Sequence, residues 1–324
     1  MGLATTRADA AVVDFAEACG PVGPVAVRGG GTHWEVGGLS APETRILRAP
    51  SGIVVFEPAE MTVRVLAGTP VAELQATLGD GGQCVNMLES STSTVGGSLA
   101  IGWSGIRRLG WGPLRDSVLQ VRYVSADGLI VKAGGPTVKN VTGFDLCRIL
   151  VGSLGTIGLM AEVILRTRPL PVEERWLSGP ADPFALRDAL YRPASVLWNG
   201  STTWVLLSGY PADVESEAQV AAGFGLLPAA GPPSLPPQRH SLRPGSLPEL
   251  KREVSGELAH EFPNELASQV AGAFVAEVGV GTVHCHHGPS RRALRPEVGE
   301  LNDRIKAAFD PTGRLNPGRE PHLR

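Results

Sequence analysis

Three glycine-rich segments in the first half of the chain constrain its fold more than any other feature. They lie at residues 28–33 (RGGGTH), 90–105 and 152–158. Glycine has no Cβ, so the backbone can adopt positive φ and backbone N–H groups can approach a ligand closely. Successive N–H groups in such loops form concave sites for anions such as phosphate. The natural ligand of these loops is therefore a polyanionic nucleotide.

Two common phosphate-binding motifs are absent from the sequence. There is no GxxxxGK[ST], and no GxGxxG stands between a strand and a helix with an acidic residue about twenty positions later. Residues 152–158 read GxxGxxG, but a strand-like segment follows them, which reverses the order of a Rossmann turn. Any one of the three loops is also typical of a surface turn, so their order along the chain carries the information.

That order resembles the FAD-binding domain of the vanillyl-alcohol oxidase and p-cresol methylhydroxylase (PCMH) superfamily, and within it the E subunits of glycolate oxidases. The resemblance extends over about residues 24–168 and returns at 301–319, where AFDP precedes RLNPGR. The part between these two segments is matched only weakly. The motifs are RGGGT at 28–32, STVGGS at 93–98, WSG at 103–105, KNVTGFD at 139–145 and GSLGTIG at 152–158.

The resemblance implies which residues hold the cofactor. In that family the first two loops wrap the diphosphate, the later loops approach the ribose, adenine and flavin, and the Asn-Pro-Gly turn folds back near the ring. His33 falls one place later than the histidine that attaches FAD in some relatives, so the resemblance implies non-covalent FAD. The expected cofactor-binding residues are Arg28, Gly29, Gly30, Gly31, Thr32, His33, Thr94, Gly96, Gly97, Ser98, Ser104, Gly105, Arg108, Lys139, Asn140, Val141, Gly143, Asp145, Gly152, Gly155, Thr156, Gly158 and Asn316.

The residue types at these positions suit the role. Backbone N–H groups, with hydroxyl groups such as those of Thr32 and Thr94, can satisfy two phosphates, and Arg28 and Lys139 can balance their charge. Lys139 is otherwise a solvated surface lysine, and Arg108 is equally well explained as part of a surface pair.

The expected fold class is α+β. We predict a PCMH-type FAD-binding domain of two α/β subdomains over residues 1–170, a short α+β cap or substrate domain over 171–300, and a C-terminal segment, 301–324, that returns to the first domain. A chain of 324 residues exceeds the usual size of one hydrophobic core, which favours such a division.

Local patterns predict individual elements. Thr69 is placed to cap a helix over 71–78, and Asp127-Gly128 is a hairpin signal between two strands. The proline-rich stretch 228–248 is expected to be a mobile loop. Strands are expected at 53–57, 61–66, 118–125, 129–132, 175–177, 196–198, 204–208, 273–278 and 281–286, and helices at 214–224 and 291–309.

The resemblance also implies a reaction, the oxidation of a small 2-hydroxy acid such as glycolate or lactate. Hydride then passes from the substrate α-carbon to flavin N5 while a base takes the hydroxyl proton. Alternation along a strand would put His284 and His286 on one face, so they are the candidate catalytic residues. The same pair is also typical of a polar strand edge or a hydrogen-bonded core position. No metal is expected, because the acids and spacing of the related metal motif are absent.

Arginines are candidates for a second role in the same reaction. Arg291, Arg292 and Arg319 could pair with a substrate carboxylate. A basic start of a helix is equally typical of a solvated face, so the two interpretations of these residues stay open.

Two roles remain open for the whole chain. The first is an FAD-dependent oxidoreductase, with a second flavoprotein subunit and an iron–sulfur subunit as partners, because four scattered cysteines provide no cluster. The second is a non-catalytic FAD-binding assembly subunit, because the cap is short. A net charge of -3 without basic clusters indicates no nucleic acid as a partner. The widely spaced cysteines form no disulfide framework, so we expect a protein of the reducing cytoplasm. The longest apolar stretch is too short and polar to insert in a bilayer, so any contact with the inner face of the membrane is expected through partners.

Overall fold

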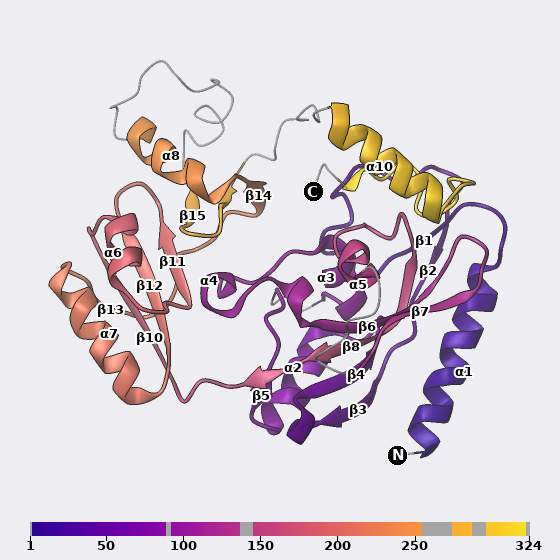
Figure 1. Ribbon diagram of the computed structural model, residues 1–324, viewed down its shortest axis with the longest axis horizontal. Coiled ribbons are helices and arrows are strands. Elements are labelled where there is room, and N and C mark those ends of the chain that lie inside the picture. The colour runs from indigo at the N-terminus through magenta and orange to yellow at the C-terminus, as the bar shows by residue number, and fades with distance from the viewer. Residues whose placement is uncertain (1, 89–91, 137–144, 255–273, 287–295, 322–324) are drawn as a thin grey trace. The chain divides into compact units, whose positions relative to one another are not determined.

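The structure is a computed structural model that describes residues 2–88, 92–136, 145–254, 274–286 and 296–321 (Figure 1). It divides into two compact units. Unit 1 comprises Met1–Gly105, Pro113–Leu170 and Ala293–Arg324, and unit 2 comprises Ile106–Gly112 and Pro171–Arg292. Both units combine helices with sheets, which confirms the predicted α+β class.

Unit 1 is built around a five-stranded antiparallel sheet. The central strand is buried from Leu159 to Leu165, because both faces of the sheet are covered. Asp127-Gly128 forms the predicted hairpin, and Gly128 has a φ of 77° that few other residues would adopt. The strands, in spatial order, are β3 (Ile53–Glu57), β4 (Thr62–Leu66), β8 (Leu159–Arg166), β6 (Val118–Val124) and β7 (Ile130–Gly134).

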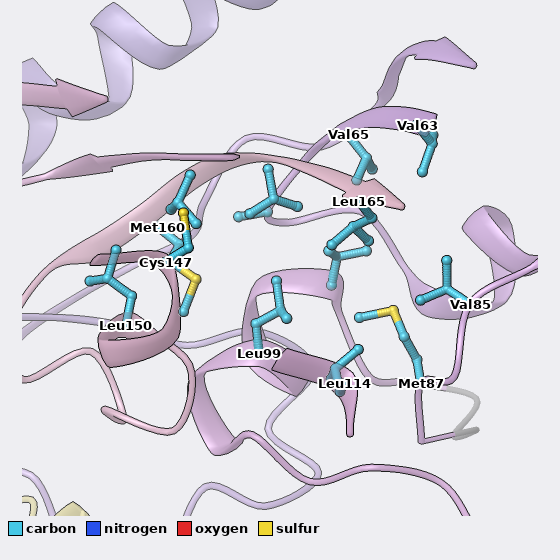
Figure 2. Close-up of a cluster of buried hydrophobic side chains, with 14 of the residues drawn as sticks. Val63, Val65, Val85, Met87, Leu99, Leu114, Cys147, Leu150, Met160 and Leu165 are labelled. Atoms are coloured by element: carbon cyan, nitrogen blue, oxygen red, sulfur yellow. The ribbon is translucent and has the colours of Figure 1, made fainter. Parts of the chain in front are cut away.

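Helices cover one face of this sheet and enclose the larger core of unit 1 (Figure 2). Helix α3 (Val95–Ile101) brings Leu99 to this core and α5 (Leu146–Leu150) brings Leu150, where they pack with Val65 and Leu165 of the sheet. Helix α2 (Val71–Asp80) joins the same core. Burying one such leucine stabilises the fold by about 1.5–3 kcal/mol.

Helix α1 (Gly2–Cys19) packs on the opposite face, where an ion-pair network reinforces the contact. Glu162 of β8 is fully buried, and its Oε2 lies 2.9 Å from Nη2 of Arg64. Asp9 of α1 pairs with Arg64 at 3.0 Å and with Arg122 at 2.5 Å. The hydrogen bond from Arg122 lowers the pKa of Asp9 below its usual value. The network therefore ties α1 to three strands of the sheet.

The C-terminal segment runs beside the first strand pair, β1 (Val25–Val27) and β2 (Arg45–Leu47). It follows α10 (Pro296–Phe309), and Asp310 holds its first turn by accepting hydrogen bonds from the backbone N–H groups of Arg314 and Leu315. The guanidinium group of Arg314 donates to the backbone carbonyls of Gly23, Ala126 and Cys19. This arrangement brings residues 316–319 against the segment that follows β1.

Unit 2 contains a seven-stranded antiparallel sheet. Helices α6 (Pro183–Ala189), α7 (Pro211–Gly223) and α8 (Leu247–Val254) contribute Leu186, Val214 and Leu250 to one core with the sheet. The short helix α4 (Arg108–Trp111) packs beside β11. The strands, in spatial order, are β13 (Leu227–Ala229), β10 (Glu173–Gly179), β12 (Thr203–Gly209), β11 (Ser195–Trp198), β15 (Val275–Glu277), β16 (Thr282–Cys285) and β14 (Gln238–Ser241).

Two local predictions were wrong, and one helix was not predicted. The stretch 228–248 is not simply a loop, because it contains β14 and parts of β13 and α8. Thr69 does not cap α2; its hydroxyl donates to Leu66 O at 2.7 Å and accepts from Gly52 N at 2.9 Å, and Pro70 is the N-cap. Helix α3 was not predicted, because two glycines lower its intrinsic helix propensity.

Candidate cofactor-binding site

Two adjoining hollows lie within unit 1, between the first glycine loop and the second. They share Gly29, Thr94 and Leu154 as common walls. The first, here called the aromatic hollow, is also lined by Gly30, Gly31, His33, Trp34, Trp103, Asn316 and Arg319. The second, here called the glycine hollow, is also lined by Arg28, Arg48, Gly68, Gly96, Gly155 and Gly158.

The first glycine loop packs against the second so closely that a side chain would not fit. A Cβ on Gly29 would overlap the hydroxyl oxygen of Thr94, and one on Gly30 would overlap the carbonyl oxygen of Thr92. The Thr94 hydroxyl itself caps α3 by accepting from Gly97 N at 3.2 Å. Glycine is therefore required here by close packing as well as by any ligand.

The first loop also presents backbone donors. The N–H of Arg28 is bonded to Leu47 O, and that of Trp34 to Gly31 O. Gly29, Gly30 and Gly31 lie between Arg28 and Trp34. Their N–H groups have no hydrogen-bond acceptor among the described residues. A run of such donors is suited to an anion.

Aromatic rings line the first hollow. His33 meets Trp103 edge to face, with ring centroids 4.8 Å apart. The Trp34 ring carries two guanidinium groups, that of Arg28 at 5.3 Å and that of Arg319 at 4.4 Å from its centroid. These rings provide apolar surface suited to a planar ligand, next to two positive charges.

Arg319 is the most unusual charged residue of the hollow. Nη1 donates to Val36 O at 2.9 Å and Nε to the Ser40 hydroxyl at 3.2 Å, while Nη2 is buried without a hydrogen-bond partner among the described residues. Burial lowers the pKa of the guanidinium group, and the charge of Glu35 opposes that effect. The sequence left open a pairing of Arg319 with a substrate carboxylate, and the structure places the residue in the lining of this hollow.

Asn316 joins the C-terminal turn to the third glycine loop. Its side-chain N–H donates to Leu154 O at 2.5 Å, and its Oδ1 accepts from the Ser40 hydroxyl at 3.0 Å. Its φ of 45° lies in the left-handed region, which asparagine tolerates better than most residues. The residue therefore lines the hollow and also holds the loops around it in place.

The third glycine loop borders the glycine hollow through Gly155 and Gly158. A Cβ on Gly158 would lie 2.6 Å from the ring of Tyr123, so the position admits no side chain. Gly152 has a φ of 85°, and the buried Thr156 hydroxyl donates to Ser153 O at 2.7 Å. Gly152 and Thr156 thus shape the loop, and neither is among the residues that line the hollows.

Several other expected residues lie away from the hollows. The buried Ser104 hydroxyl accepts from Leu114 N at 2.9 Å, and a Cβ on Gly105 would lie 3.0 Å from Asn86 Oδ1. Asp145 caps α5 by accepting from Arg148 N, and Arg108 belongs to unit 2.

Other expected residues do line the aromatic hollow, namely Thr32, Thr94, Gly97 and Ser98. Lys139, Asn140, Val141 and Gly143 lie outside the described residues, as do Arg291 and Arg292.

The two candidate catalytic histidines differ in environment. His284 on β16 is buried in unit 2, with Nε2 2.8 Å from Oε1 of Glu277, which also accepts from Arg239 at 3.0 Å. His286 lies beyond the strand end and is exposed. Strand register puts Arg239 opposite His284. Sequence reasoning missed Glu277 and Arg239. The tight turn between β15 and β16 could have indicated Glu277, because it pairs the strand of Glu277 with the strand of His284.

The cluster of His284, Glu277 and Arg239 is charged and buried. Burial lowers the pKa of the Arg239 guanidinium group, and Glu277 opposes the effect. The second carboxylate oxygen of Glu277 is buried without a hydrogen-bond partner among the described residues. Within the same described part of the chain, no three histidine, cysteine or acidic side chains are grouped as a metal site would require.

The residues around the two hollows fit FAD. A dinucleotide needs donors for a diphosphate, apolar surface for two ring systems and a balancing positive charge. The glycine N–H groups, the aromatic side chains and the unpartnered Nη2 of Arg319 are of those three kinds.

Two family models match the sequence. The FAD binding domain matches residues 4–134, and the C-terminal domain of FAD linked oxidases matches residues 247–319. These matches confirm FAD as the cofactor.

Curated relatives match the chain over less than half of their length. Glycolate oxidase subunit GlcE of Escherichia coli (strain K12) is 33% identical over 151 residues, which cover 46% of this chain and 43% of that protein. D-lactate dehydrogenase of Archaeoglobus fulgidus is 34% identical over 148 residues, which cover 45% of this chain and 33% of that protein.

A solved structure agrees on the fold. Alkyldihydroxyacetonephosphate synthase superposes with a TM-score of 0.65 at 13% identity, covering 94% of this chain and 73% of that one. At this identity the likeness concerns the fold alone. None of the helices in the described part of the chain is long and apolar enough to cross a membrane.

Proposed function

We propose that the chain, which matches the FAD binding domain and the C-terminal domain of FAD linked oxidases, is an FAD-dependent oxidoreductase that oxidises a small 2-hydroxy acid. The observation that carries the proposal is the aromatic hollow, where glycine N–H groups and a buried arginine accompany three aromatic side chains. The substrate class is taken from the relatives, whose names specify glycolate and D-lactate.

The chain's residues would divide the work of holding the cofactor. Gly29, Gly30 and Gly31 would donate backbone N–H groups to the diphosphate, and Arg28 would supply positive charge. Trp103 and His33 would offer apolar surface to the ring. When bound, FAD supplies the two-electron acceptor for the hydride that leaves the α-carbon of the acid.

His284 is the proposed base for the hydroxyl proton. Its Nε2–H would donate to Glu277, which fixes the tautomer and leaves Nδ1 as the nitrogen that accepts a proton. Glu277 would also stabilise the imidazolium ion that results, as a carboxylate does in other histidine pairs. The product is a 2-oxo acid. His286 stays the second candidate.

Partners and location complete the proposal. The Escherichia coli relative is named as a subunit of glycolate oxidase, which supports a place in a complex with a second flavoprotein and an iron–sulfur subunit. Such a complex would work in the cytoplasm, at the inner face of the membrane through those partners. The alternative role of a non-catalytic FAD-binding assembly subunit stays open for test.

Anaerobic reduction of the flavin tests the proposal. The purified holoprotein is mixed with glycolate, D-lactate, L-lactate and 2-hydroxyglutarate, alone and with the candidate partner subunits, and flavin absorbance is followed. We expect at least one acid to bleach the flavin bands and to yield the matching 2-oxo acid. Bleaching by none of them would refute catalysis and leave the assembly role. A protein that neither carries FAD nor binds added FAD would refute both.

A further inference from the structure

We propose that Arg319 is a ligand of the FAD diphosphate, a role that rests on the proposed function and deepens it. The residue lies two positions before residue 321, where the described part of the chain ends, and it lines the same hollow as the first glycine loop. The FAD binding domain match ends at residue 134, so this ligand would come from a different part of the chain.

The burial of Arg319 requires a compensating anion. The residue is 8% exposed, and its Nη2 has no hydrogen-bond partner among the described residues. A buried donor without an acceptor costs free energy, and more when it carries charge. Glu35 is exposed and forms no ion pair with Arg319 in the described part of the chain, so it compensates the charge only from a distance. An anionic ligand would remove this cost.

The C-terminal turn holds the guanidinium group in place. Ala41 N donates to Pro317 O at 2.9 Å, and Glu320 N donates to Gly37 O at 2.7 Å, so the two segments run together on both sides of Arg319. Gly318 has a φ of 87°, and a Cβ there would lie 3.1 Å from Ala41 N. The arginine is therefore positioned before any ligand arrives.

The diphosphate is the anion that the surroundings favour. All three loop glycines line the aromatic hollow together with Arg319, and their N–H groups have no acceptor among the described residues. Arg28 and Arg319 both lie over the Trp34 ring, so two guanidinium groups flank the loop. Two positive charges match the two negative charges of a diphosphate ester.

Binding of FAD fragments to the apoprotein tests the role. Dissociation constants for FAD, ADP and riboflavin are measured for the wild type, Arg319→Gln and Arg319→Lys. We expect Arg319→Gln to weaken FAD and ADP alike, by about 10- to 100-fold, as for the loss of one charge-assisted hydrogen bond. Riboflavin, which has no phosphate, should bind as before. Arg319→Lys should fall between, because lysine keeps the charge without the planar fork.

Controls separate this role from a structural one. Arg187→Gln removes the same charge from an exposed ion pair of unit 2 and should leave all three constants unchanged. FAD binding to Arg319→Gln should also depend less on ionic strength than in the wild type. Unchanged ADP affinity, equal weakening of riboflavin, or a wild type that binds FAD but not ADP would each overturn the inference. A wild type that binds no FAD would overturn the proposed function as well.

Discussion

Replacing Gly30 by alanine should weaken FAD binding through backbone packing alone. The added Cβ would overlap the carbonyl oxygen of Thr92 and lie 2.5 Å from its carbonyl carbon. Two carbon atoms normally make contact at about 3.5–4.0 Å. Both atoms on the Thr92 side belong to the backbone, so no rotamer change relieves the overlap. The first loop and the segment before α3 must therefore move apart by about 1 Å or more.

The magnitude follows from the cost of overpacking. Forcing an extra methyl group into a close-packed site costs about 1–3 kcal/mol. Where the cost arises in the arrangement that binds FAD, affinity should fall by about 5- to 150-fold. Where it reduces the stability of unit 1, the melting temperature should fall by about 2–4 °C per kcal/mol.

Titration of the apoprotein with FAD and thermal unfolding measure the two effects. Gly79→Ala is the matched control, because Gly79 lies in α2 with an ordinary φ and no atom within 4 Å of the added Cβ. It should stabilise the fold by about 0.4–1 kcal/mol and leave FAD affinity unchanged. Wild-type FAD affinity together with a wild-type melting temperature in Gly30→Ala would refute the packing argument.

Two further predictions concern titratable groups. His284→Gln should slow flavin reduction by a 2-hydroxy acid by about 100-fold or more without releasing FAD. Glu277→Gln should slow the same reaction less and alter its pH profile. Unchanged anaerobic rates of flavin reduction in both variants would exclude a catalytic role for the pair. Burial alone would raise the pKa of Asp310, but hydrogen bonds from Lys306 and from backbone N–H groups outweigh it and lower the pKa overall. A lowered carboxyl pKa stabilises the fold above its unfolded value near 3.8 and loses that effect as the pH falls through the folded value. Thermal melts should therefore show stability falling below about pH 5, with a smaller fall in Asp310→Asn; equal slopes would contradict this.

Much of the fold was predictable because the signals were local. The β3 strand occupies the predicted residues, and the hairpin at Asp127-Gly128 follows from a turn whose φ values favour glycine. Helix α3 was not predicted because tertiary packing stabilises it and local helix propensity does not. A Cβ on Gly96 would lie 2.9 Å from Ala67 O, so the helix keeps a glycine at a cost in propensity that tertiary contacts offset.

The two ion-pair clusters were not predictable in the same way. Glu162 reads as one polar residue in an apolar strand, and only the sheet register brings Arg64 and Arg122 to it. Glu277 and Arg239 meet in the same manner, across strands far apart in the chain. Charges buried in this way have partners that no sequence spacing reveals.

The sequence by itself determined the ligand class and the positions at which the backbone must carry no side chain. Glycine runs, turn residues and the Asn-Pro-Gly motif act through the φ and ψ angles of their own neighbours, so they can be interpreted without knowledge of distant segments. Only the tertiary structure decided that Arg319 is buried against Trp34 with an unpartnered Nη2, and that His284 faces Glu277. Burial and charge pairing depend on which remote segments exclude water together, and that is a property of the folded chain.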